Sequence, residues 1–184
     1  MTDPPARKMH MADGGYRPAL NAQFSSDTKT QFIVGAGVVN IGSDGGRMLP
    51  AVKQLDARYG FTPNEFLVDG GFSKREDIEQ LAAQYGTKIF MPIPKSIRNT
   101  KPGCKAETPH VIAWRERMAT LDAQIIYKER ASTIECVNAL ARNRGLQQFR
   151  VRGLSKVTAV VLLFAIAHNI MCLVRLSKKA AKVA

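Results

Sequence analysis

Short apolar runs typical of β-strands alternate along this chain with stretches of helical periodicity. Residues 21–27 and 31–40 predict two strands joined by a hairpin turn. Apolar side chains at helical spacing then predict a helix over 48–59, with Gly60 as its stop. Strands that alternate with helices indicate an α/β fold, in which a mixed sheet carries helices on its faces.

The middle of the chain repeats this alternation. Residues 66–71 predict a strand that ends in Asp69 and two glycines. Ser73 is predicted to cap the next helix, because Glu76 stands three residues later, at the spacing of a capping box. That helix is expected to stop at Gly86 and to be followed by a short strand at 88–94. Three further helices are expected at 109–122, at 124–144 and after Gly153.

The charge balance favours a polyanionic partner. The 184 residues include 27 Lys and Arg against 15 Asp and Glu, a formal net charge of +12. Basic proteins gain affinity for nucleic acid by releasing its counterions, although a solvated basic surface has the same composition. The length predicts one domain. Residues 1–20 are expected to form a loop or an extended end, residues 21–176 the folded domain and residues 177–184 a basic tail.

An apolar segment at 157–174 is nearly long enough to span a bilayer. His168 and Asn169 interrupt it, and polar groups are costly in lipid. We therefore interpret it as a buried core helix with His168 as a core residue, and we expect no membrane partner. The alternative is a membrane-associated protein anchored by residues 157–174. Trp114 is likewise expected in the core. Three dispersed cysteines and a polar N-terminus without a signal peptide predict a cytoplasmic protein.

Asp69 is the first candidate functional residue. A carboxylate at the end of a buried strand lies where open α/β sheets place their sites. The two glycines that follow allow a ligand or metal to approach the backbone. The alternative is an Asx-turn or a helix cap, which an Asp before glycines also forms.

A second candidate site lies on the predicted helix at 124–144. At roughly 100° per residue, Tyr127, Glu135, Asn138 and Arg142 fall within an arc of about 80°. One face thus offers an acid, a base and an aromatic hydroxyl. A solvated charged face, or an ion pair between Glu135 and an arginine, remains the alternative.

Several blocks of the sequence resemble the DDE transposases of bacterial insertion sequences. Tyr127-Lys-Glu-Arg-Ala-Ser-Thr-Ile-Glu135 resembles the Tyr-x-x-Arg…Glu signature around the family's last catalytic acid, and Arg142 stands at its basic position seven residues later. Phe66-Leu-Val-Asp-Gly-Gly-Phe72 is similar to the strand with the second catalytic Asp. The other similar blocks, which extend the resemblance over about residues 3 to 175, are residues 14–27, 38–44, 150–157 and 165–170.

The resemblance implies an RNase-H-like mixed sheet with flanking helices, in which three carboxylates hold two divalent ions. Asp69 and Glu135 would be catalytic metal ligands for Mg²⁺ or Mn²⁺, since paired hard cations stabilise phosphoryl transfer. DNA would be the substrate, at the element ends and at the target. The residues implied in DNA binding are Tyr127, Lys128, Arg130, Asn138 and Arg142.

The family's first acid lies on a strand upstream of the segment that matches from Asp3 onward. We therefore expect a partial catalytic domain that lacks the first, acid-bearing strand. Such a fragment is expected to be inactive alone, and active only if an upstream transposase polypeptide supplies the acid. A homo-oligomer is a second possible partner. The alternative function is a non-catalytic basic module that binds DNA or a transposase.

Overall fold

The computed structural model describes residues 3, 5–11, 13–94 and 108–182, and its backbone contacts divide the chain into two compact units. The central unit is Ser43–Arg130. The hairpin unit combines Met1–Gly42 with Ala131–Ala184. Length alone predicted a single domain, and the second unit arises because the two ends of the sequence come together.

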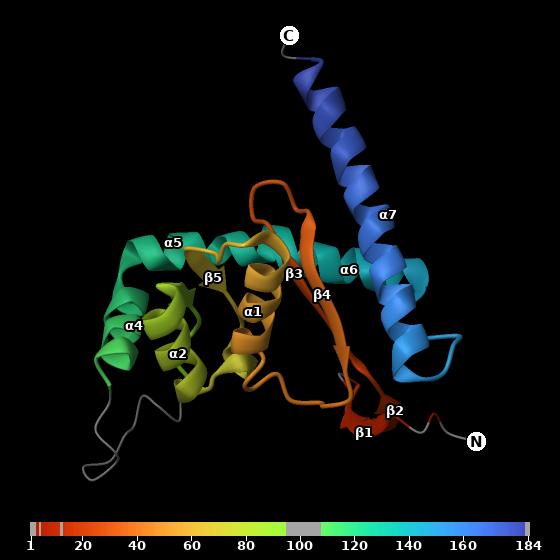
Figure 1. Ribbon diagram of the computed structural model, residues 1–184, viewed down its shortest axis with the longest axis horizontal. Helices are drawn as coiled ribbons and strands as arrows, with labels where there is room; N and C mark the ends of the chain where they lie inside the picture. Colours follow the sequence, from red (N-terminus) through yellow and green to blue (C-terminus); the bar gives the residue numbers. More distant parts are fainter. Residues whose placement is uncertain (1–2, 4, 12, 95–107, 183–184) are drawn as a thin grey trace. The chain divides into compact units, whose positions relative to one another are not determined.

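In the central unit, two parallel strands are surrounded by helices (Figure 1). Strand β5 (Glu65–Leu67) pairs with β6 (Lys88–Phe90), with Phe66 opposite Ile89. Parallel strands need a crossover connection, and α2 (Arg75–Tyr85) supplies it. The other helices of this unit are α1 (Met48–Tyr59), α4 (Pro109–Ala119) and α5 (Leu121–Arg130).

Buried apolar side chains from β6, from the residues that directly follow the two strands, and from α1, α2 and α4 form the core of the central unit. Trp114 is 1% exposed, and its indole N–H donates to the Met91 carbonyl at 3.2 Å. The prediction of a core tryptophan is therefore confirmed. The buried members of this core are Met48, Val52, Val68, Ile78, Leu81, Ile89, Met91, Val111 and Trp114.

The two glycine stops of this unit are confirmed. Gly60 and Gly86 follow α1 and α2 with φ of 70° and 64°, the left-handed conformation that glycine adopts without steric cost. The predicted capping box at Ser73 is wrong. Ser73 instead ends the preceding 3₁₀ turn η1 (Gly70–Phe72), with its backbone N–H donating to the Gly70 carbonyl, so α2 begins at Arg75 without a side-chain cap.

The long helical region after residue 108 is divided differently from the prediction. It breaks at Thr120, because the Thr120 hydroxyl accepts from the Ala123 N–H at 3.2 Å and so caps α5. Three short segments follow α5: a π-helical segment η2 (Ala131–Glu135), α6 (Cys136–Ala141) and a second π-helical segment η3 (Arg142–Leu146). A backbone kink at Arg144 and Gly145 interrupts η3.

The predicted hairpin is confirmed in the hairpin unit. Strand β3 (Asn21–Ser26) pairs antiparallel with β4 (Ile33–Val39), with Phe24 opposite Ala36. The Asp27 carboxylate closes the turn by accepting from the Thr30 N–H at 2.7 Å and from its hydroxyl at 2.5 Å.

The loop predicted for residues 1–20 is wrong over two short stretches. Strand β1 (Arg7–His10) pairs antiparallel with β2 (Tyr16–Ala19). Asp13 accepts from the Gly15 N–H at 3.1 Å, and Gly14 adopts a φ of 81°. The sequence contains this signal, because Asp-Gly between two short runs is a common hairpin turn.

Helix α7 (Leu154–Ala180) lies along β4 in the hairpin unit (Figure 1). Asn169 pairs with both backbone groups of Ile33, accepting from its N–H at 2.8 Å and donating to its carbonyl at 2.9 Å. His168 is 3% exposed and its Nε2 lies 2.9 Å from the Gln31 carbonyl, so the core histidine is confirmed. The buried core residues of this unit are Ile33, Ala36, Val137, Val161 and Ala165.

The prediction of a buried core helix is right for only one face of α7. Val157, Val161 and Ala165 on that face are buried, whereas Leu163 and Ile166 are more than half exposed. By length and composition the helix could also cross a membrane, and 33% of its apolar window is buried. The predicted basic tail from residue 177 is helical up to Ala180, because α7 continues to that point.

The α/β class is confirmed, but the described strands do not form one mixed sheet. They form three separate two-stranded sheets, β1–β2, β3–β4 and β5–β6. Isolated two-stranded sheets are marginal in water; α7 packs on β4, and α2, α4 and α5 pack on β6. The RNase-H-like arrangement stays a prediction.

Replacing Asn169 should destabilise the hairpin unit. In Asn169→Ala the N–H and carbonyl of Ile33 lose their partners, which costs about 1–3 kcal/mol. We expect urea unfolding followed by circular dichroism to show this loss, while Lys178→Ala, an exposed change on the same helix, stays near wild type. A loss no larger than that of the control would contradict the role of Asn169.

Candidate functional site

Asp69 follows the paired end of β5 in the central unit. The Val68 N–H donates to the Phe90 carbonyl at 3.0 Å, so strand-like pairing reaches the residue before Asp69. Asp69 lies at the carboxyl end of a parallel strand pair, as predicted. Its Oδ1 accepts from the Gly71 N–H at 2.8 Å, which caps η1. One of the two carboxylate oxygens of Asp69 therefore forms the turn, as the alternative interpretation predicted.

The other oxygen of Asp69 faces a predicted DNA-binding residue. Arg130 Nη2 lies 3.4 Å from Asp69 Oδ2, and the side chains of Arg130 and Asp69 are 18% and 44% exposed. The Arg130 guanidinium also lies over the Tyr127 ring, 5.9 Å from its centroid. The central unit thus brings together three of the predicted site residues, from the end of β5 and from α5.

A second carboxylate lies near Asp69. A Cβ atom added to Gly71 would lie 3.0 Å from Asp69 Oδ1 and 3.8 Å from Asp44 Oδ2. Because Gly71 has no side chain, the space beside its Cα, near the carboxylates of Asp69 and Asp44, stays open. Asp44 ends the sequence block at residues 38–44, and its place in Gly42-Ser-Asp-Gly-Gly46 repeats the Asp-Gly-Gly pattern of Asp69.

Carboxylate oxygens are suitable ligands for Mg²⁺ or Mn²⁺. Asp69 fits this chemistry because it is partly exposed, ends a strand and faces the space above Gly71. In the described part of the chain no three His, Cys, Asp or Glu side chains gather into one metal-binding group.

Tyr127 and Lys128 line a shallow, mostly apolar pocket of about 340 Å³ in the central unit. Pro92 and Ile93 form one side of it, and Met118 and Gln124 complete the lining. The pocket places an aromatic ring and an ammonium group from α5 beside an apolar surface.

The remaining predicted site residues belong to the hairpin unit. Glu135 ends η2, Asn138 lies in α6 and Arg142 begins η3; all three are exposed. The arc predicted with Tyr127 assumed regular α-helical spacing, which does not hold through the π-helical turn between Tyr127 and Glu135. Tyr127 and Glu135 also lie in different units, so the arc stays a prediction.

The profile of the transposase DDE domain matches residues 96–174. This stretch, less than half of the chain, is therefore similar to the transposase DDE domain. It contains Glu135 together with the predicted DNA-binding residues, and it confirms the resemblance seen in the sequence. The searches of curated proteins and of solved structures return no match to the chain.

The family match covers only one of the two candidate acids. Glu135 lies inside the matched stretch, whereas Asp69 lies before it. Arg130, inside the stretch, is 3.4 Å from Asp69. The contact between these two residues therefore connects the matched part of the transposase DDE domain to the strand end before it.

Asp69 should contribute little to folding. In Asp69→Asn the amide oxygen can still accept from Gly71, and the lost ion pair is partly exposed and worth less than about 1 kcal/mol. We expect the free energy of unfolding in urea to change by no more than that amount. In Asp69→Ala the cap is lost as well, which should cost about 0.5–2 kcal/mol. A large loss of unfolding free energy in Asp69→Asn would indicate that the charge of Asp69 has a structural role.

Proposed function

We propose that this protein acts in DNA transposition, cutting and joining DNA strands by phosphoryl transfer with Asp69 and Glu135 as metal ligands. The observation that carries the proposal is the ion pair of Asp69 with Arg130, because Arg130 belongs to the stretch matched by the transposase DDE domain. This contact supports a shared role for Asp69 and the matched stretch, and it does not depend on the sequence resemblance.

Each acid is suitable for its proposed role within its own unit. Asp69 is partly exposed and ends a strand, and Glu135 is exposed on a helical segment. When bound, paired Mg²⁺ or Mn²⁺ ions would stabilise negative charge on the attacking and leaving oxygens of the phosphate. The chain's part is to hold carboxylate oxygens at the metals and to place cations along the DNA.

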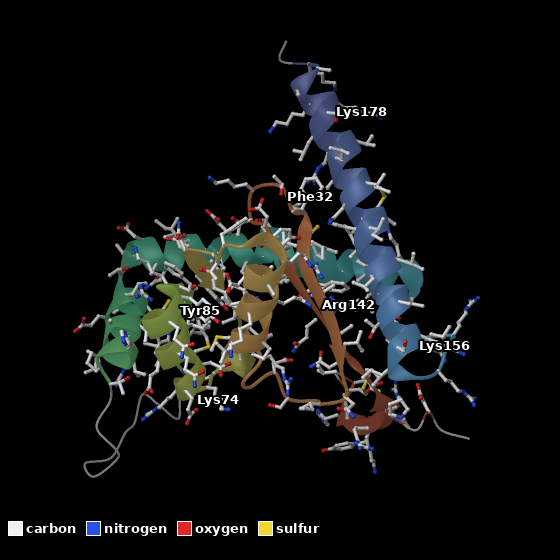
Figure 2. All side chains as sticks on the ribbon, in the orientation of Figure 1. Phe32, Lys74, Tyr85, Arg142, Lys156 and Lys178 are labelled. Atoms are coloured by element: carbon white, nitrogen blue, oxygen red, sulfur yellow. The ribbon has the colours of Figure 1, made fainter. Side chains whose placement is uncertain are left out.

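The DNA-binding role is proposed for Tyr127, Lys128, Arg130, Asn138 and Arg142. Guanidinium groups suit phosphate oxygens because they donate several hydrogen bonds in one plane. Arg142 is exposed (Figure 2), as is Lys128, and the net charge of +12 would draw DNA toward the protein. Arg130 already neutralises one carboxylate, so we expect it to orient Asp69 as well as to contact a phosphate.

The resemblance assigns the third carboxylate to a strand that precedes the other two acids in the sequence. We propose that another polypeptide segment supplies this strand and completes an RNase-H-like sheet. The hairpin unit contains an antiparallel pair, β3–β4, and the central unit a parallel pair, β5–β6, and a mixed sheet uses both kinds of pairing. A cytoplasmic location and a complex with an upstream transposase polypeptide follow from this proposal as predictions.

The activity is tested by nicking of a supercoiled plasmid in Mg²⁺ or Mn²⁺, with each protein mixed with the upstream transposase polypeptide that supplies the third carboxylate. We expect metal-dependent nicking to fall to the protein-free background in both Asp69→Asn and Glu135→Gln, because each change removes a charged ligand. Circular dichroism would verify that both variants fold. Equal nicking by all three proteins would contradict the proposal. DNA binding that needs no metal, with no nicking by the wild-type chain, would support the alternative of a non-catalytic module.

The space above Gly71 gives a sharper test of the metal site. In Gly71→Ala the new methyl group would lie 3.0 Å from Asp69 Oδ1, so the carboxylate must shift. Gly70→Ala is the matched control, because a Cβ there meets nothing within 4 Å. We expect Mn²⁺ binding, followed by electron paramagnetic resonance, to weaken in Gly71→Ala and to stay unchanged in Gly70→Ala. Equal affinity in both variants would exclude a metal at Asp69.

A further inference from the structure

Helix α7 has a second apolar face that the described residues of the hairpin unit leave exposed. The face on β4 holds Val157, Val161, Ala165, His168 and Cys172. The opposite face, about 160° around the helix, holds four side chains that are more than half exposed. These are Leu163 at 65%, Ile166 at 58%, Ile170 at 55% and Leu173 at 57%. Exposed apolar patches of this kind mark interaction surfaces.

The spacing of these four residues is that of a helix-pairing seam. Steps of three, four and three residues separate Leu163, Ile166, Ile170 and Leu173, as in the a and d positions of a heptad repeat. The adjacent Leu162 and Val174 are also exposed, at 38% and 47%, and widen the face. The surface can therefore accept a second helix with the same spacing.

The order of the apolar residues is symmetric about His168. Ile166 and Ile170 lie two residues to either side, Leu163 and Leu173 five, and Leu162 and Val174 six. An identical helix running in the opposite direction would place each member of a pair against the other member. We propose that α7 docks antiparallel against α7 of a second copy of this chain, as an isologous contact about a two-fold axis at His168.

The charges of α7 favour this direction over a parallel one. The helix carries Lys156, Arg175, Lys178 and Lys179 and has no acidic residue. Figure 2 shows Lys156 near its start and Lys178 near its end. In a parallel pair the basic C-terminal ends of the two helices, which carry Arg175, Lys178 and Lys179, would lie side by side, and like charges repel. In the antiparallel pair these ends lie at opposite ends of the contact, and each lies near the N-terminal end of the other helix, where Lys156 is the only charged residue.

The docking is tested on the whole chain by sedimentation equilibrium over a range of concentrations. We expect dimers with a dissociation constant in about the micromolar range, because the seam is short. Ile166→Glu and Ile170→Glu should each raise that constant at least about tenfold. Met171→Glu is the matched control, since Met171 is 42% exposed on α7 but lies off the seam. Monomeric wild-type chain, or equal effects of all three changes, would overturn the proposal.

Direction is tested by disulfide formation between two singly substituted chains. One carries Leu163→Cys, the other Leu173→Cys, and both have Cys104 and Cys136 replaced by Ser. Mixed and oxidised, they should yield the heterodimer in the antiparallel arrangement, because a disulfide needs Cα atoms within about 7 Å. Predominant homodimers of each variant would show a parallel pair and overturn the proposed register.

A lipid surface is the rival partner for this face. In a flotation assay with vesicles that contain anionic lipid, we expect the dimer to remain in the fraction of unbound protein. If the wild-type chain floats with the vesicles and Ile166→Glu does not, the face binds a membrane instead. The docking requires no bound metal or DNA, so it can fail while the proposed catalysis stands, and it can hold while the catalysis fails.

Discussion

The hairpin unit depends on the way α7 holds the turn between β3 and β4. Gln31 in that turn has a φ of 65°, a left-handed conformation that is uncommon for a residue with a side chain. Its carbonyl contacts His168, and its side chain binds Arg175 and the Ser132 carbonyl. These contacts fix a strained residue from several directions, which is how such a conformation persists.

In the central unit, one carboxylate shapes the turn and also faces a cation. Asp69 uses one oxygen to cap η1 and presents the other to Arg130. Because the cap fixes the side chain, the second oxygen has a defined direction. The interaction that makes Asp69 look like an ordinary turn residue also makes it a well-ordered ligand. The turn-forming and functional interpretations of Asp69 are therefore compatible.

Local patterns predicted those features of the fold that depend on local physics. The glycine stops at Gly60 and Gly86 and the β3–β4 hairpin follow from backbone freedom and short-range pairing. The capping box at Ser73 failed because the preceding turn uses that residue. The exposed face of α7 could not be predicted, since an apolar sequence does not show which of its sides is covered. For the site, the resemblance and the family match concern the same helix region, whereas Asp44 emerged only from three-dimensional proximity.

The division of the sequence between the two units has a consequence for synthesis on the ribosome. The central unit is one continuous stretch and can form as soon as Arg130 has emerged. The hairpin unit combines the two ends of the sequence, so β3 and β4 are made early but wait for α7. Until Asn169 is synthesised, the backbone of Ile33 and the apolar side of the hairpin have no permanent cover. During that interval the nascent chain is most exposed to aggregation and most dependent on chaperones.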